Sequence, residues 1–458
     1  MRVAMLTPLP PARTGVAHYA SLLLPALRER VAVDVLEEMR DGYDAYVYQL
    51  GNNPHHEWIY DAAVRRPGVV VLHDLVLHHL IVEKTLARGD VKGYVEALRA
   101  NHGAAGEAWA RGRAAGLHSE MGNFLLPASV EIARRATAVI VHNDYARTRL
   151  QSFGVTTPIH VVPHPYVPTR GAEEPRSRGA VIGFLGFLTS AKRAHVVLEA
   201  FAAARARDPR LELLIVGEPA PDIDLRLLQI DGVTMTGYVS DEEFPKYYAR
   251  CDRFVNLRYP SAGETSGTLI RALDAGKPVA VSDYAQFAEL PDDVVTKIPL
   301  GDGEVEALAH FMLAGSVDPA RQRAWLESHA SLSLAVEGYL RALAPAAQSE
   351  SAEVRASLPL FPSLTIVSTH PLILRNDGDV TLRTRTYGTP EYRLIARLFD
   401  GERVVDDRWL ALPCDLEPGA SVEIELPLHG RGDRIELRHA LQDVPAVDDR
   451  PFGVLDGR

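Results

Sequence analysis

Residues 258–281 read R-Y-P-S-A-G-E-T-S-G-T-L-I-R-A-L-D-A-G-K-P-V-A-V, and no other stretch says as much about the fold. Residues 252–257 predict a strand, and the apolar spacing after Gly267 predicts a helix. One carboxylate, Glu264, stands in the loop between them. Because the first N–H groups of a helix have no partner inside it and carry partial positive charge, we expect a site for a phosphorylated, hydroxyl-rich ligand.

The residue types around the expected helix start suit such a ligand. Ser266 is a good N-cap, and Gly267 lets a ligand approach the backbone closely. Glu264 repels phosphate, so sugar hydroxyls are its natural partners. The other interpretation is an ordinary turn between a strand and a helix with a glutamate on the surface, and only the rest of the chain distinguishes the two.

The composition of the 458 residues is that of a globular protein, with 47% hydrophobic and 24% charged residues. Lys and Arg number 49 against 60 Asp and Glu, which gives a net charge of -11. This balance argues against a nucleic-acid partner, although it leaves room for a local basic pocket that binds a small phosphate.

The chain lacks the patterns of secreted and membrane-spanning proteins. Residues 1–10 are broken by Pro8 and Pro10, which excludes a signal peptide there, and no apolar run approaches the roughly 18 residues of a transmembrane helix. The two cysteines, Cys251 and Cys414, fit a reducing compartment. We expect a cytoplasmic protein without a transmembrane segment, with peripheral contact to the inner face of the membrane left open.

Short apolar runs alternate with helical stretches twice along the chain. The first set of buried-strand runs lies at 1–6, 45–49, 69–72, 138–141 and 159–162. A polar segment broken by prolines at 168–178 predicts a hinge, and strands follow at 180–185, 211–216, 253–257 and 278–281. This order predicts an α/β fold with two Rossmann-like domains, at 1–170 and 177–345, that face a common cleft.

The last part of the chain has another pattern. Residues 346–360 show no periodicity and predict an exposed linker. From 361 to 458, short alternating runs with turn residues between them predict an all-β domain, a β-sandwich of immunoglobulin-like type.

Several motifs in residues 1–345 occur in an order that is typical of a known protein family. They are Thr14-Gly15, L-H-D at 72–74, V-V-P-H-P at 161–165, G-F-L-T-S-A-K-R at 186–193, L-L-I-V-G-E at 213–218, V-T-M-T-G-Y-V at 233–239 and the stretch quoted first. In this order they resemble the retaining, metal-independent glycosyltransferases of the GT-B fold, family 4-like, known as glycosyl transferases group 1. The resemblance implies a nucleotide-diphosphate sugar bound in the cleft.

The resemblance assigns the phosphate and sugar ends of the donor site. It implies that Lys192 and Arg193 contact the donor diphosphate, with Phe187 where the family often has another basic residue. Gly15 brings backbone N–H groups to the same diphosphate from the other domain. His73, from the L-H-D motif, faces the transferred sugar. By itself, a histidine after a strand is more often a structural residue, and the family resemblance favours the functional interpretation.

The resemblance also assigns the nucleoside end. Glu264 matches the first carboxylate of the family's pair, which holds the donor sugar, but Arg271 stands where the ribose-binding carboxylate is expected. Asp274 lies on the same helical face and could replace it, or it could be an ordinary exposed residue. Backbone contacts to the base are expected from Tyr238 and Val239. The remaining donor-binding residues are expected at the helix start, at Ser266, Gly267 and Thr268.

No metal cofactor is expected. The sequence Asp222-Ile223-Asp224 has the spacing of a cation-binding motif, but it follows prolines and suits a helix start. The leading hypothesis is a retaining glycosyltransferase that moves a sugar from a nucleotide-diphosphate sugar to an acceptor hydroxyl of a surface polysaccharide or glycoconjugate. The alternative is a non-catalytic carbohydrate-binding or assembly protein built on a degraded glycosyltransferase core.

Overall fold

The computed structural model describes residues 1–12, 14–117, 120–168, 180–220, 223, 225–240, 243–344, 364–378, 381–382, 384, 392–441 and 451–457. The chain divides into two compact units. The first comprises Met1–Leu75, Ile132–Gln151 and Thr156–Ala352, and the second comprises Val76–Glu131, Ser152–Val155 and Glu353–Arg458.

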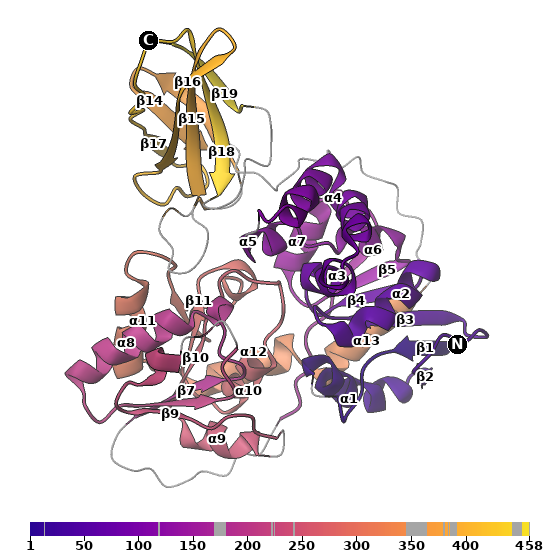
Figure 1. Ribbon diagram of the computed structural model, residues 1–458. Helices are drawn as coiled ribbons and strands as arrows, with labels where there is room; N and C mark the ends of the chain where they lie inside the picture. The colour runs from indigo at the N-terminus through magenta and orange to yellow at the C-terminus, as the bar shows by residue number, and fades with distance from the viewer. Residues whose placement is uncertain are drawn as a thin grey trace. The chain divides into compact units, whose positions relative to one another are not determined.

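The first unit contains a parallel sheet of six strands in the order β2-β1-β3-β4-β5-β6 (Figure 1). The strands are β1 (Arg2–Leu6), β2 (Ala32–Leu36), β3 (Ala45–Leu50), β4 (Val69–Leu72), β5 (Ala138–Val141) and β6 (Ile159–Val161). Strands β4 and β5 consist of buried apolar residues throughout, which is typical of a sheet covered on both faces. All the strands run in one direction, so the loops after them gather at one edge of the sheet.

Two helices from opposite ends of this unit pack on the first sheet together. Helix α1 (Gly15–Arg28) follows β1, whereas α13 (Leu332–Leu343) comes more than 300 residues later, and both share one apolar core with β1. The hydroxyls of Tyr19 and Tyr339 lie 3.1 Å apart between them. Other helices that follow strands of the first sheet are η1 (Pro54–His56), α2 (Glu57–Arg65), α6 (Val130–Arg135) and α7 (Asp144–Ser152).

The second parallel sheet also has six strands, in the order β12-β11-β10-β7-β8-β9. They are β7 (Val181–Leu185), β8 (Glu212–Val216), β9 (Val233–Met235), β10 (Arg253–Asn256), β11 (Val279–Ser282) and β12 (Thr296–Ile298). Alternate strand residues belong to two cores. One core contains α8 (Ala194–Arg207) and α11 (Glu304–Ala314), and the other contains α9 (Phe244–Arg250), α10 (Gly267–Asp274) and α12 (Pro319–His329). Short helical turns are η3 (Ser190–Lys192), η4 (Leu225–Leu228) and η5 (Ala285–Phe287).

The second unit contains a helical segment and an all-β segment. The helical segment comprises α3 (His78–Lys84), η2 (Leu86–Arg88), α4 (Val91–Ala114) and α5 (Glu120–Leu125). The all-β segment comprises β13 (Leu364–Thr369), β14 (Leu372–Asn376), β15 (Tyr392–Asp400), β16 (Arg403–Ala411), β17 (Ser421–Glu423), β18 (Arg434–Leu441) and β19 (Gly453–Asp456).

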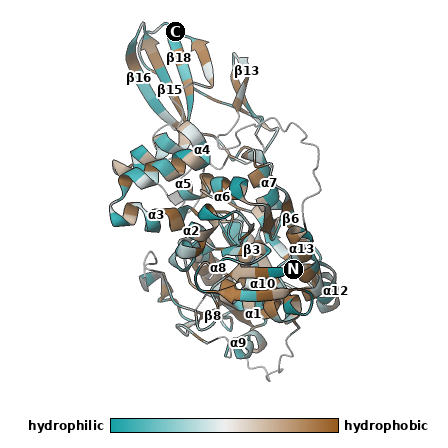
Figure 2. Ribbon diagram, turned by 90° about the vertical axis from the view of Figure 1, so that its right-hand side faces the viewer, coloured by the Kyte–Doolittle hydropathy of each residue, from teal (hydrophilic) through white to brown (hydrophobic). Residues whose placement is uncertain are grey.

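The C-terminal strands form two antiparallel sheets, ordered β13-β14-β17 and β16-β15-β18-β19. Leu374 of the smaller sheet and Leu394 of the larger sheet belong to one buried core, which makes the domain a β-sandwich. Hydrophobic and hydrophilic residues are interleaved along its strands (Figure 2), and β15 is mostly buried whereas its neighbour β16 is mostly exposed.

The fold class expected from the sequence is confirmed: two parallel α/β sheets precede an all-β domain. The immunoglobulin-like type of the sandwich and the linker at 346–360 stay predictions, since the linker lies outside the described residues. Residues 319–343 form two helices, because Ser331 caps α13 and separates it from α12. Within the described ranges, no helix is long and apolar enough to cross a membrane.

Candidate functional site

A pocket of about 630 Å³ lies where the carboxyl ends of the two parallel sheets meet in the first unit. Its wall is made by the loops after β1, β4, β5 and β6 of the first sheet and after β7, β9 and β10 of the second. This edge is where ligands bind in open α/β sheets.

Two helices begin at this pocket, one from each sheet. Thr14 caps α1 by accepting a hydrogen bond from Ala17 N–H (3.0 Å), and Gly15 is the first helical residue. Ser266 caps α10 in the same way, accepting from Leu269 N–H (3.2 Å). The first turn of α10, with Gly267 and Thr268, therefore presents backbone N–H groups and its positive dipole end to the pocket.

Glu264 lies in the loop between β10 and α10, and its carboxylate is already engaged. Arg258 Nε donates to Glu264 Oε1 over 2.9 Å, and Ser261 Oγ donates to Oε2 over 3.3 Å. Asn143, which follows β5 in the other sheet, donates to the carbonyl oxygen of Gly263 (2.9 Å). The backbone around Glu264 is thus fixed from both sides of the pocket.

Lys192 is the last residue of η3 and lines the pocket. Its ammonium donates to the carbonyl oxygen of Leu185 over 3.3 Å. Burial lowers the pKa of Lys192 well below its ordinary value, and the nearby Arg258 lowers it further, while Glu264 opposes both. An anion bound beside Lys192 would raise this pKa again.

His73 follows β4 and lines the pocket from the first sheet. Its Nε2 is in hydrogen-bond contact with the side-chain amide of Gln49, and its Nδ1 lies 3.2 Å from His142 Nε2. The ring also packs edge-on against Tyr19. Burial lowers the pKa of His73 well below its ordinary value, with a further contribution from His142, so the imidazole is neutral.

The expected nucleoside end of the pocket is formed by Tyr238, Val239 and Arg271, together with Phe244. The side chain of Tyr238 is 46% exposed, whereas Val239 is buried. Arg271 Nη2 donates to His18 Nε2 of α1 over 2.9 Å, and its guanidinium lies 5.7 Å from the centre of the Phe244 ring. Arg271 therefore joins α10 to α1 across the pocket.

Asp274 is one turn further along α10 and does not line this pocket. It accepts a hydrogen bond from the Tyr166 hydroxyl (2.7 Å) and lines an adjoining cavity of about 800 Å³. Arg271 and Phe244 line both spaces. A role for Asp274 in ribose binding would require the nucleoside to extend into the second cavity.

The expectation that Arg193 supplies charge to the donor phosphate is wrong for this structure. Arg193 has a left-handed backbone conformation (φ 59°), which turns its side chain into the core. Its guanidinium forms a two-pronged ion pair with Glu304 at the start of α11, and both side chains are 1% exposed. Arg193 ties η3 to α11 and is not accessible to a ligand.

The structure brings most of the expected site residues to one pocket. These are Gly15, His73, Lys192, Tyr238, Val239, Glu264, Ser266, Gly267, Thr268 and Arg271. Arg258, His18 and Asn143 were not expected from the sequence. Arg258 could have been found, because it lies two residues after a mostly buried strand and six residues before Glu264.

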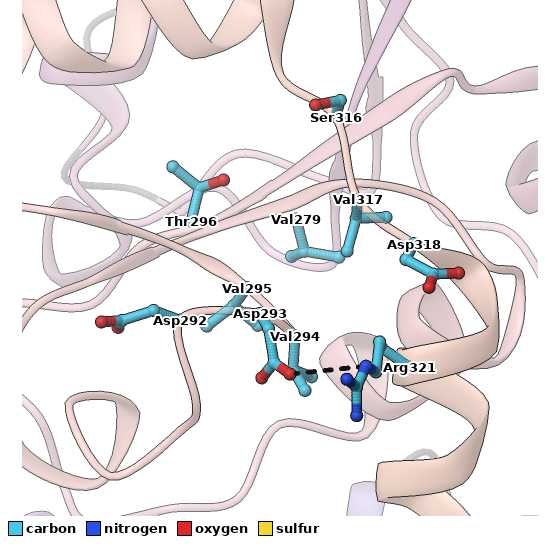
Figure 3. Close-up of a pocket in the computed structure, with 10 residues that line it drawn as sticks. All are labelled: Val279, Asp292, Asp293, Val294, Val295, Thr296, Ser316, Val317, Asp318 and Arg321. Carbon is cyan, nitrogen blue, oxygen red and sulfur yellow. Dashed lines mark ion pairs between the residues drawn. The ribbon is translucent and has the colours of Figure 1, made fainter.

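A smaller hollow of about 380 Å³ lies at the opposite, amino-terminal edge of the second sheet (Figure 3). Its acidic side chains have local roles: Asp293 pairs with Arg321 (3.9 Å), Asp292 pairs with Lys297 (2.9 Å), and Asp318 caps α12. Asp222 and Asp224 lie outside the described residues. Across the described ranges, no group of three or more His, Cys, Asp or Glu is arranged to hold a metal ion.

Residues 179–316 match the family model described as glycosyl transferases group 1. This part of the chain is therefore similar to glycosyl transferases group 1, and residues 179–316 are called the group 1 domain for this similarity. They include Lys192, Arg258, Glu264 and the start of α10. Mannosylfructose-phosphate synthase of Agrobacterium fabrum (strain C58 / ATCC 33970) is 30% identical over 118 residues, 23% of this chain and 25% of that protein. The chain thus spans about a quarter of the curated relative that it matches.

Solved structures share the architecture that contains the group 1 domain. Anabaena Alr3699/HepE in complex with UDP has a TM-score of 0.50 and 15% sequence identity, covering 75% of this chain and 99% of that chain. The same protein in complex with UDP-glucose has a TM-score of 0.50 and 16% identity, covering 74% and 99%. At this level of identity the likeness shows the fold, which is the two-sheet arrangement of GT-B proteins.

Proposed function

We propose that the protein is a nucleotide-sugar-dependent, retaining glycosyltransferase that requires no metal ion. The observation that carries this proposal is the meeting of Lys192, Glu264 and two helix starts in one pocket. Two N-terminal helix ends and a buried ammonium suit a diphosphate, whereas the carboxylate beside them suits hydroxyl groups. Anabaena Alr3699/HepE was crystallised with UDP and UDP-glucose, so uridine nucleotides are the first donors to test.

The proposed chemistry is electrostatic. As the bond between the sugar's C1 and the phosphate oxygen breaks, negative charge grows on the leaving diphosphate, where Lys192 and the first turn of α10 stabilise it. The acceptor oxygen forms its new bond to C1 on the same face, and its proton passes to the leaving phosphate. Glu264 and the neutral His73 hold sugar hydroxyls, and neither acts as the nucleophile.

The test is release of nucleoside diphosphate from a panel of nucleotide sugars in EDTA. We expect release by the wild type and a loss of at least a hundredfold in Glu264→Ala and Lys192→Ala. Glu306→Ala and Lys297→Ala are matched controls. Glu306 pairs with Arg207 and Lys297 pairs with Asp292, and both ion pairs lie away from the pocket.

The alternative function, a non-catalytic carbohydrate-binding or assembly protein, rests on Arg271, which replaces an expected carboxylate. It predicts binding of nucleotide or sugar without turnover. No release from any donor, with or without sugar acceptors, would overturn the enzyme proposal. The acceptor in a surface polysaccharide or glycoconjugate, the cytoplasmic location and the peripheral membrane contact stay predictions.

A further inference from the structure

The pocket contains a guanidinium, that of Arg258, with only some of its hydrogen bonds made to the protein. Arg258 lies two residues after the end of β10, and its side chain lines the pocket although it is only 10% exposed. Its backbone N–H donates to Ser282 Oγ over 2.9 Å, which fixes where the side chain starts. Burying a guanidinium this deeply is costly unless its hydrogen bonds and its charge are matched.

The hydrogen bonds of Arg258 are only partly matched. Nε donates to Glu264 Oε1 (2.9 Å) and Nη1 donates to the carbonyl oxygen of Leu257 (2.8 Å). Within the described ranges, Nη2 has no acceptor. The guanidinium is therefore held rigidly on one edge, while its other edge is available to a ligand in the pocket.

The charges in the pocket are not balanced either. Lys192, Arg258 and Arg271 line it, against the carboxylates of Asp74 and Glu264. Asp74 accepts a hydrogen bond from Asn52 N–H (2.7 Å) on the side of the first sheet. Glu264 pairs with Arg258, and the pKa of Lys192 is lowered mainly by burial and further by Arg258, while Glu264 opposes both. The start of α10 adds further positive charge.

We propose that Arg258, together with Lys192, binds the sugar-linked phosphate of the donor. This proposal rests on the proposed function and replaces the role first expected for Arg193. Arg258 would contact Glu264 through Nε and the phosphate through Nη2, so one guanidinium would set the distance between the phosphate and the carboxylate that holds the sugar. A planar guanidinium is suited to two such partners at fixed geometry, and an ammonium is not.

The experiment is calorimetric titration of the full chain with UDP, GDP, ADP and dTDP, followed by the monophosphate that matches the tightest diphosphate. We expect Arg258→Gln to weaken diphosphate binding at least tenfold and monophosphate binding less than twofold, since only the diphosphate reaches this end of the pocket. Arg258→Lys should be intermediate. Arg250→Gln is the control, because Arg250 lies on the surface of the same domain and pairs with Glu212.

Each other outcome has a distinct meaning. Unchanged diphosphate binding in Arg258→Gln, or an equal loss for mono- and diphosphate, would overturn the role of Arg258. The same holds if diphosphate binding is unchanged and only UDP-glucuronate loses affinity, since the anion would then be a carboxylate on the sugar. If the wild type binds no nucleoside diphosphate, the proposed function fails instead. If Arg258→Gln does not fold, the losses of diphosphate and monophosphate binding are compared in Arg258→Lys instead, and an equal loss or no loss there would overturn the role of Arg258.

Discussion

Asn143 Nδ2 donates a hydrogen bond to the carbonyl oxygen of Gly263 over 2.9 Å, so a residue that follows the first sheet holds the loop of the second sheet that bears Glu264. Gly263 has a φ of 73°, and a Cβ on it would come 2.7 Å from the Cβ of Leu75. Only glycine allows this close approach without strain. The two halves of the pocket are therefore built against each other at the residue next to the carboxylate.

Replacing Asn143 by Ser should slow donor turnover about fivefold, because one hydrogen bond is worth about 1 kcal/mol net. Asn143 Oδ1 also accepts from Ala146 N–H (2.8 Å) at the start of α7, and Ser keeps an oxygen for that cap. Steady-state kinetics and a thermal melt separate the two effects. A loss of melting temperature without a change in kcat would show that Asn143 acts only on stability.

Binding of a nucleoside diphosphate should be coupled to proton uptake by Lys192. The pKa of this ammonium is lowered by burial and by Arg258, and a phosphate beside it raises the pKa again. Affinity should therefore be constant at low pH and fall as the pH rises through the pKa of the ligand-free lysine. Calorimetry in PIPES and Tris, whose ionisation enthalpies differ, measures the protons taken up. Lys192→Arg stays charged and should abolish the coupling; the same uptake in this variant would assign the proton elsewhere.

His142 should make the fold sensitive to acid. Burial lowers its pKa to about 4, while its Nδ1–H donates to the carbonyl oxygen of Val162 (2.8 Å). The unfolded chain takes up this proton first, so the stabilising contribution is complete above pH 6.5 and is lost as the pH falls toward 4, by about 1.4 kcal/mol per pH unit. The free energy of unfolding, measured with urea at pH values between 7 and 5, should fall less steeply with falling pH in His142→Gln than in the wild type, by this amount per pH unit. Equal slopes in the two proteins would contradict the prediction.

Removing the guanidinium of Arg193 should destabilise the fold by about 3–5 kcal/mol, because it leaves Glu304 buried without its counter-ion. Arg193→Met with Glu304→Leu removes both charges and should recover most of the stability. Denaturant unfolding measures both proteins. If the double variant folds but no longer binds a nucleoside diphosphate that the wild type binds, Arg193 would regain its role at the phosphate.

The sequence was sufficient for the parts of the fold with strong local signals. Buried runs such as 69–72 and 138–141 became central strands at those positions, because short runs of consecutive apolar residues, rich in Val and Ile, favour a buried strand. The short strands β9 and β12 were not predicted. Each has three residues and lies at an edge of the sheet, where it pairs with one neighbour, so its local sequence signal is weak.

The same division applies to the pocket. Glu264, Ser266 and Gly267 were predictable because their roles follow from one loop and the helix after it. Arg193 was not, since its partner Glu304 lies 111 residues further along and the local backbone conformation turns it away from Lys192. Lys192 and Arg193 are adjacent in sequence, but only Lys192 lines the pocket, because Arg193 is buried against Glu304.

The return of α13 to the first sheet also constrains how the protein is made. Ala335, Val336 and Tyr339 belong to the same core as Val3 and Met5, and Gly338 packs against Val162 without room for a Cβ. During synthesis, the ribosome must therefore finish the whole group 1 domain before the amino-terminal sheet can bury its last apolar face. Nascent chains shorter than about 343 residues should remain dependent on chaperones, since exposed core surface of this kind is prone to aggregate.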